Sequence, residues 1–364
     1  MGAMDVKAIG IAGTAKNTGK TTTLSWLLQS ALEDGFLPAV TSIGYDGEAV
    51  DNVTGLPKPR LAVAPGMLVA TAERCLSLGS AQLKILERSS LDTPLGPVFL
   101  ALVHSPGLVV LAGPNKTSDL KVLLQRIREE KASVILVDGA FGRLAPMQAT
   151  DGLIMAQGAA RFSEVSRLVA QTVALAGLFS LTGPAVSENA EGNRRVISAA
   201  SLLEVGVTPD RGMPSEKGED ALVPGPDNRS SDFLVNGMLT LAALQSLVLQ
   251  IKAPARIILE NTIQLLLSGD VEAVWRLVSS LAEKGIEIWA QHPLPLLAFT
   301  INPFYPEWIE GSRIFRERYL QAEALEAALA TTVPFPVFDV KRNGTGLWQL
   351  VKAFLLKTQG MGQY

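Results

Sequence analysis

The chain begins with a glycine-containing loop that lies between an apolar run and an amphipathic stretch. The apolar run is Ala8 to Ala12, the amphipathic stretch is Thr22 to Leu32, and the loop reads Gly13-Thr14-Ala15-Lys16-Asn17-Thr18-Gly19-Lys20-Thr21. Backbone N–H groups of a tight loop at a helix N-terminus form an anion site, and small residues let the main chain approach phosphates. The pattern predicts a strand, a phosphate-binding loop (P-loop) and a helix, and therefore a nucleotide-binding protein.

The residue types in this loop have separate chemical roles. Gly19 allows close approach of the main chain, Lys20 brings a positive charge to the β- and γ-phosphates, and the Thr21 hydroxyl can bind Mg²⁺. We expect Lys20 to take part in catalysis as well as in binding. The residues expected to hold the nucleotide are Gly13, Thr14, Ala15, Lys16, Asn17, Thr18, Gly19, Lys20, Thr21 and Thr22.

The loop departs from the pattern GxxxxGK[ST] at one position. The first glycine of the pattern would fall at position 14, which is threonine, and Gly13 lies one residue earlier. The spacing resembles that of dethiobiotin synthetase and its relatives, in which a Gly-Thr pair opens a loop of the same length. We therefore treat the loop as a variant P-loop.

Composition excludes several classes of protein. The 364 residues are 48% hydrophobic and 18% charged, so the chain can bury a large core and is long enough for two domains. A net charge of −3 argues against a nucleic-acid-binding surface, and no DNA or RNA partner is expected. The lone Cys75 excludes an internal disulfide framework. Because the apolar stretch Val98 to Ala112 is broken by Pro106 and Gly107 and no export signal is evident, we expect a cytoplasmic protein without a membrane partner.

Apolar runs alternate with helical patterns in the first half of the chain. The segment from Pro65 to Leu78 is expected to lead into a helix, and a further helix is expected from Thr117. This alternation predicts an α/β fold of the P-loop NTPase type, with a mostly parallel sheet, helices on both faces and ligands beyond the carboxyl ends of the strands. The expected strands are Ala39 to Ile43, Val98 to Val103, Leu108 to Ala112, Val134 to Val137 and Gly152 to Ala156.

The second half of the chain predicts a second, smaller α/β unit. A polar segment from Val207 to Ser231, rich in proline and glycine, separates the halves and reads as a linker or a long loop. The expected division is residues 1–206, 207–231 and 232–364. The patterns behind it are strands at Arg256 to Leu259, Ile286 to Ala290, Leu297 to Ile301 and Val337 to Val340, and helices at Val271 to Lys284, Phe315 to Ala330 and Gly346 to Leu356.

An aspartate follows the apolar run Val134 to Val137. P-loop proteins hold Mg²⁺ through an aspartate at the end of such a strand, opposite the Ser or Thr of the loop. We expect Asp138 to bind the metal and to act in catalysis, although Asp-Gly after a strand is also an ordinary turn signal. Arg143 is close enough in sequence to contact a phosphate, and a solvated arginine is the alternative.

Three carboxylates follow the second expected strand, at Asp46, Glu48 and Asp51. Near a phosphate site they would repel one another unless a cation compensates them, which favours Asp46 or Glu48 as a Mg²⁺ ligand, direct or through water. The loop from Gly44 to Asp51 would then sense the terminal phosphate. The alternative is a solvated acidic loop.

Two further segments have alternative interpretations. Gly113 to Asp119 contains Asn115-Lys116, which is similar to a guanine-specifying motif. It has one residue too many and precedes Asp138, so a capped helix start is favoured over guanine recognition. Thr300-Ile301-Asn302-Pro303 follows a strand and either closes the site or ends the strand. His104 and His292 lack ligand spacing and are expected to be structural.

Taken together, these stretches resemble the P-loop reactivase subunit associated with lysine 5,6-aminomutase. Phe141 and Gly142 differ from the residues expected in that family, and Val207 to Ser231 has no counterpart. The stretches that carry the resemblance are Gly13 to Thr23, Thr41 to Glu48, Asp51, Lys58-Pro59, Asp138-Gly139-Ala140 with Arg143, Asp151-Gly152, Gly158-Ala159 and Thr300 to Pro303.

The resemblance implies an ATPase that, with a partner ATPase subunit, helps an adenosylcobalamin-dependent aminomutase replace a damaged corrinoid. The chain has no corrinoid-binding Asp-x-His-x-x-Gly motif, so it would act on the mutase and would not carry the cofactor. A homodimer would suit such a protein.

Two other classes of function are open. One is an ATP-dependent small-molecule ligase of the dethiobiotin synthetase type, in which Lys58 or Asn302 would bind the substrate. The other is a nucleotide-gated scaffold without turnover. The expected cofactors are ATP and Mg²⁺, and the sequence leaves the choice between ATP and GTP open.

Overall fold

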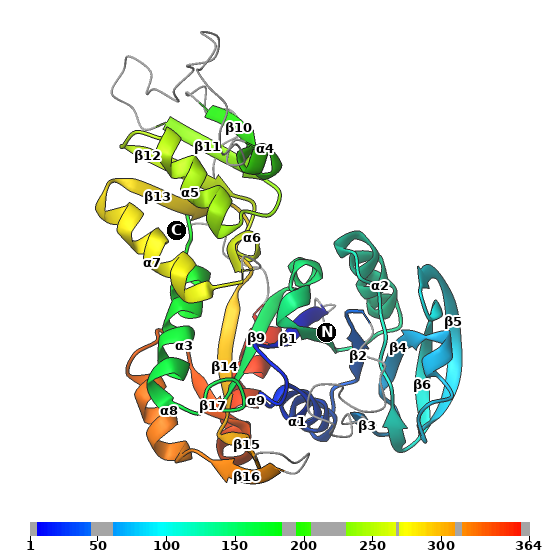
Figure 1. The fold of residues 1–364 in the computed structure, drawn as a ribbon. Coiled ribbons are helices and arrows are strands. Elements are labelled where there is room, and N and C mark those ends of the chain that lie inside the picture. The colour runs from blue at the N-terminus through cyan, green and yellow to red at the C-terminus, as the bar shows by residue number, and fades with distance from the viewer. Residues whose placement is uncertain are drawn as a thin grey trace. The chain divides into compact units, whose positions relative to one another are not determined.

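The computed structural model describes residues 6–44, 61–183, 194–204, 231–266, 269–309 and 315–357 (Figure 1). The chain forms two compact units. The first combines Met1–Val169 with Pro295–Tyr364, and the second is Ala170–Leu294. This division differs from the expected boundaries at 206 and 232, because strands near the C-terminal end of the chain pair into the sheet of the first unit.

Within the described residues, the first unit contains a nine-stranded sheet in the order β17-β14-β9-β1-β8-β2-β4-β6-β5. The strands from β17 to β4 are parallel, and β6 and β5 run antiparallel to their neighbours. The expected mostly parallel α/β sheet is therefore confirmed. The strand bounds are β1 Lys7–Gly13, β2 Pro38–Ser42, β4 Leu68–Ala72, β5 Gln82–Thr93, β6 Gly96–Ser105, β8 Val134–Ala140, β9 Gly152–Gly158, β14 Leu296–Asn302 and β17 Val337–Asp339.

The central strand β1 is buried along its whole length. It pairs with β8 on one side and with β9 on the other. Parallel strands that are covered on both faces read as continuous apolar runs, which is why the sequence pattern located β1, β8 and β9 correctly.

Helices pack on one face of this sheet. Helix α1 (Lys20–Glu33) and helix α9 (Val340–Leu356) share one hydrophobic core with β1 and β8. The core residues include Leu24, Leu27 and Leu28 of α1, Leu347, Val351 and Leu355 of α9, and Ile9, Ile11, Val134 and Leu136 of the sheet.

The opposite face is covered by a short 3₁₀ turn, Ala145–Ala149, and by helix α2 (Thr117–Glu129), which contacts that turn. Met147 of the turn lies against Gly10 of β1 and Gly139 of β8. The sheet is therefore enclosed from both sides, and its carboxyl edge is left for a ligand.

Two segments differ from the expected secondary structure. Pro65 to Leu78 does not lead into an α-helix: it forms β4 and a single 3₁₀ turn, Glu73–Cys75, because β4 is held between β2 and β6. The predicted helix at Phe315 is also wrong at its start. There the chain forms β16 (Phe315–Tyr319), which pairs with β15 (Phe304–Trp308), and helix α8 begins only at Ala322 and ends at Ala330.

The second unit has a four-stranded parallel sheet in the order β10-β11-β12-β13 among its described residues. It is a smaller α/β unit, as the patterns predicted. Its elements are β10 Arg194–Ser198, β11 Ser231–Asn236, β12 Ala255–Leu259, β13 Ile286–Ala290, α4 Ala199–Glu204, α5 Leu241–Gln250, α6 Ile263–Leu266 and α7 Val271–Glu283. Helix α3 (Val165–Phe179) contains the boundary between the two units. The first unit also contains a small sheet of β3 (Leu61–Val63) and β7 (Gly107–Val109).

None of the helices in the described part of the chain has both the length and the hydropathy needed to cross a bilayer. The predicted linker, Val207 to Ser231, lies outside the described residues except for Ser231.

Candidate nucleotide-binding site

The predicted P-loop lies between the end of β1 at Gly13 and the start of α1 at Lys20. Gly19 has a φ of 90°. Residues with a Cβ atom are strained in this backbone conformation, whereas glycine adopts it freely. A Cβ atom at Gly13 would lie 2.6 Å from Thr18 Oγ1. Both glycines are therefore required by the tight path that brings the loop into the N-terminus of α1, where unpaired amides favour an anion.

Hydrogen bonds hold the loop to neighbouring strands. The Thr14 N–H donates to Ala156 O at 3.1 Å, and the Thr14 hydroxyl donates to Gln157 Oε1 at 2.8 Å. Asn302 Nδ2 of β14 donates to Asn17 O, also at 2.8 Å. Thr14, which stands where the common pattern has glycine, is thus a buried anchor to β9.

Lys20 and Asp138 meet at the carboxyl edge of the sheet. Lys20 Nζ lies 2.9 Å from Asp138 Oδ1 and 3.1 Å from Oδ2. Asp138 belongs to β8, directly beside β1, where it is paired in register with Ile11. Each side chain is about one-fifth exposed, at 22%. The structure therefore brings the two predicted catalytic residues into one ion pair, and their partial burial strengthens it.

The remaining predicted metal ligands are placed only in part. Thr21 lies in the first turn of α1, one residue after Lys20. Asp46, with Glu48, Asp51 and Lys58, lies outside the described residues. Within the described part of the chain, no three His, Cys, Asp or Glu side chains gather as a metal cluster. Thr21 and Asp138 still offer the hydroxyl and carboxylate oxygens that Mg²⁺ prefers.

Two other predicted residues converge beside this edge. A Cβ atom at Gly44, which follows β2, would clash with Asn115 Oδ1 and would lie 2.7 Å from Arg143 Nη1. Arg143 closes the short turn Phe141–Arg143 after β8. The helix that follows Asn115 begins at Thr117, and its N-cap residue Lys116 makes no side-chain capping bond.

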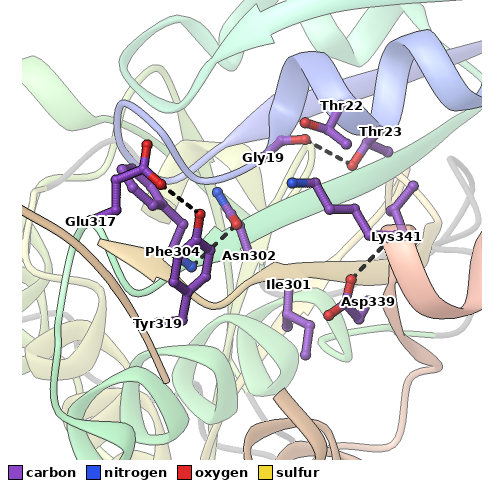
Figure 2. A pocket seen from close by; sticks show the side chains of 11 residues that line it. Gly19, Thr22, Thr23, Ile301, Asn302, Phe304, Glu317, Tyr319, Asp339 and Lys341 are labelled. Atoms are coloured by element: carbon purple, nitrogen blue, oxygen red, sulfur yellow. Dashed lines mark hydrogen bonds between the residues drawn. The ribbon is translucent and has the colours of Figure 1, made fainter. Parts of the chain in front are cut away.

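A cavity of about 230 Å³ opens beside the N-terminus of α1 (Figure 2). Three parts of the first unit form its walls: the start of α1, the hairpin β15–β16 with the end of β14, and the start of α9. Figure 2 shows Glu317 and Tyr319 near Asn302, with Lys341 reaching in from the other side. The lining residues are Gly19, Thr22, Thr23, Ile301, Asn302, Phe304, Glu317, Tyr319, Asp339, Val340 and Lys341.

Hydrogen bonds fix several side chains of this cavity. The Tyr319 hydroxyl donates to Glu317 Oε2 at 3.2 Å, and this bond raises the pKa of the Tyr319 phenol above its ordinary value. Asp339 Oδ1 accepts from Lys341 N at 3.0 Å and caps α9. Asn302 Oδ1 accepts from Phe304 N at 3.3 Å, so Asn302 links the P-loop to the hairpin.

The sequence singled out part of the cavity wall, at Gly19, Thr22 and the stretch Thr300 to Pro303. It missed the wall formed by the hairpin and by the start of α9. Asp339 and Lys341 could have been found from the rule that parallel strands end at one edge of a sheet, because β17 ends beside β14. Glu317 and Tyr319 gave no such signal, since their segment was expected to be helical.

No family model matches the chain. A 128-residue segment, 35% of this chain, is 27% identical to a tetraacyldisaccharide 4'-kinase of Chlorobium luteolum and covers 29% of that protein. The chain thus matches less than a third of the length of this relative. The similarity to a kinase supports a nucleotide-binding protein of the P-loop type, and it supports neither a reactivase role nor a corrinoid-related one.

Proposed function

We propose that this protein binds Mg-ATP at the loop Gly13–Thr22 and promotes transfer of the terminal phosphate. The observation that carries the proposal is the ion pair of Lys20 and Asp138 at the end of a tight loop that leads into α1. A cationic amine, a helix N-terminus and a carboxylate at one sheet edge are the groups that a metal–triphosphate complex needs.

Each part of the ligand has a matching group in the chain. The amides at the start of α1 and the Lys20 amine suit the phosphates, and Thr21 and Asp138 suit the metal. Bound Mg²⁺ would neutralise charge on the phosphates during transfer. In hydrolysis, a water oxygen bonds to the γ-phosphorus while the bond to the β,γ-bridging oxygen breaks, which yields ADP and phosphate.

We further propose that this hydrolysis serves the reactivation of an adenosylcobalamin-dependent aminomutase. The support is the set of sequence stretches that resemble the reactivase subunit, including the Asp138-Gly139-Ala140 strand end and Thr300 to Pro303. A conformational change driven by the nucleotide would alter which surface the mutase meets.

A second candidate is phosphoryl transfer to a small acceptor. The 27% identity to a kinase over 128 residues favours it. The acceptor would then take the place of water at the γ-phosphorus.

The test is Mg²⁺-dependent ATP binding and phosphate release by the intact protein and by Lys20→Ala, with Lys121→Ala on the exposed side of α2 as a charge-matched control. Loss of ATP binding in Lys20→Ala alone supports the proposal. ATP binding that is equal in all three proteins would contradict it.

The same assay separates the finer roles. Phosphate release that rises with an adenosylcobalamin-dependent aminomutase supports reactivation. Release unaffected by the mutase but dependent on an added carboxylic acid or sugar acceptor supports the small-molecule reaction instead.

A further inference from the structure

The cavity lies on the opposite side of β1 from Asp138. The order of the sheet is β17-β14-β9-β1-β8, and the cavity takes its residues from the ends of β14 and β17, whereas Asp138 belongs to β8. A metal held by Thr21 and Asp138 must contact the outer phosphates. A triphosphate laid along the loop therefore directs its nucleoside away from β8, past Thr22 and toward the cavity.

The size of the cavity suits one ring system. Its volume of about 230 Å³ is below the roughly 300–1,000 Å³ typical of sites that enclose a complete drug-sized ligand. A planar base can enter it while the sugar and phosphates remain outside, along the start of α1.

One face of the hairpin β15–β16 is aromatic with a single carboxylate. Side chains alternate along a strand, so Phe315, Glu317 and Tyr319 share a face with their partners Trp308, Pro306 and Phe304. The Phe304 and Tyr319 rings pack edge to face at 5.6 Å, and Tyr319 is 59% exposed. An aromatic ring with an open face is a stacking platform for a base.

Glu317 is the accessible acceptor of this wall. Its Oε2 accepts the Tyr319 hydroxyl, and Oε1 can accept a hydrogen bond from a ligand. Asp339, the other carboxylate of the cavity, is 4% exposed and caps α9. An ionised carboxylate only accepts hydrogen bonds, so it pairs with an amino group and repels a carbonyl oxygen.

We propose that this cavity binds the purine base of the nucleotide, and that Glu317 selects a 6-amino purine over a 6-oxo purine. The inference rests on the proposed function, since it requires a nucleoside triphosphate at the loop. Adenine carries a donor at position 6, where guanine and hypoxanthine carry an acceptor. Tyr319 holds Glu317 in place and stacks on the ring.

The test compares dissociation constants for ATP and inosine triphosphate. Adenine has an amino group at position 6 and an acceptor nitrogen at position 1, whereas hypoxanthine has a carbonyl oxygen at position 6 and an N–H at position 1. We expect the unchanged protein to bind ATP about tenfold or more tightly than inosine triphosphate. Glu317→Gln can donate as well as accept, so the preference should fall to about threefold or less while ATP still binds. A preference that persists in Glu317→Gln, or equal binding of both nucleotides by the unchanged protein, overturns the inference.

Two controls distinguish recognition of the base from changes in folding and from binding of the phosphates alone. Glu307→Gln removes a carboxylate on the other face of the same hairpin, where Glu307 pairs with Arg318 at 2.8 Å, and it should keep the full preference. Inorganic triphosphate that binds as tightly as ATP would exclude a base site while leaving the proposed function standing. No binding of any triphosphate would contradict the proposed function, and the base site with it.

Discussion

Lys20 Nζ contacts both carboxylate oxygens of Asp138, at 2.9 and 3.1 Å, so each side chain neutralises the other. The same two groups are those that a phosphate and a metal would engage. Ligand binding must therefore replace one ion pair by two new ones, and the pair keeps both side chains at the sheet edge until then.

Removal of the Asp138 charge should separate binding from turnover. In Asp138→Asn, no carboxylate competes with the phosphates for the Lys20 amine, so we expect ATP affinity without Mg²⁺ to be unchanged or higher. Mg²⁺-dependent phosphate release should fall by about 100-fold, because the metal loses a charged ligand. Titrations with and without a chelator measure the first effect, and a phosphate-release assay measures the second. Asp92→Asn, on exposed β5, is the control. Release at the unchanged rate in Asp138→Asn would contradict the assigned role.

Asn302 should influence phosphate binding without contacting a phosphate. Asn302→Ala removes the 2.8 Å hydrogen bond to Asn17 O that fixes the loop. One such bond contributes about 0.5–1.5 kcal/mol, so we expect ATP binding to weaken by roughly two- to thirteenfold. Isothermal titration measures the change, with Asn236→Ala in the second unit as control. Identical affinities in the two variants would show that the bond does not position the loop.

Comparison of Gly19→Ala with Gly35→Ala should distinguish the effect of backbone strain on stability from the effect of loop geometry on ATP binding. Gly19 and Gly35 both have positive φ, at 90° and 77°, so alanine at either position costs about 1–2 kcal/mol of stability. A Cβ atom at Gly19 would also lie 3.0 Å from Asn302 Cβ, whereas nothing lies within 4 Å at Gly35. Thermal unfolding should therefore show a loss for Gly19→Ala at least as large as that for Gly35→Ala, and only Gly19→Ala should lose ATP binding. ATP binding by Gly19→Ala at full affinity would contradict this.

Acid should weaken the contact between α1 and α9. Hydrogen bonds from Lys352 and Trp348 lower the pKa of Asp34 below its ordinary value of 3.8. A lowered folded-state pKa stabilises the protein above the unfolded value, and this stabilisation is lost as pH falls through the folded value. Asp34→Asn should therefore be less stable than the unchanged protein at neutral pH, with a difference that shrinks below pH 3.8. Urea unfolding at a series of pH values measures it, and a constant difference would be the contrary result.

The sequence predicts the strand, the loop and the helix at residues 7–33 well because their signals are local. Gly19, Lys20 and Thr21 act within one turn of one helix, and the buried strands beside them read as apolar runs. For the same reason the sequence places Asp138 correctly near the end of a buried strand, while its metal-binding and catalytic roles stay predictions.

The cavity and the domain division were less predictable because they depend on pairing. An apolar run shows that a strand is buried but does not show which strand it pairs with. The expected strand Leu297 to Ile301 was therefore assigned to the second unit, although it forms β14 and pairs with β9. Phe315–Tyr319 was expected to be helical, yet pairing with β15 overrides that local preference. The proposed phosphate-sensing role of Asp46 stays a prediction, since that loop lies outside the described residues.

The cavity combines residues of the phosphate loop and α1 with residues that lie far later in the chain, which has a consequence for biosynthesis. Gly19 and Thr22 leave the ribosome before the second unit does, and the whole second unit must be translated before Asn302 and Asp339 exist. Until then β9 has an open edge where β14 will pair. A chain that terminates before β14 has the phosphate loop but lacks the complete cavity. Only a chain translated as far as α9 can therefore bind a nucleotide at both the loop and the cavity.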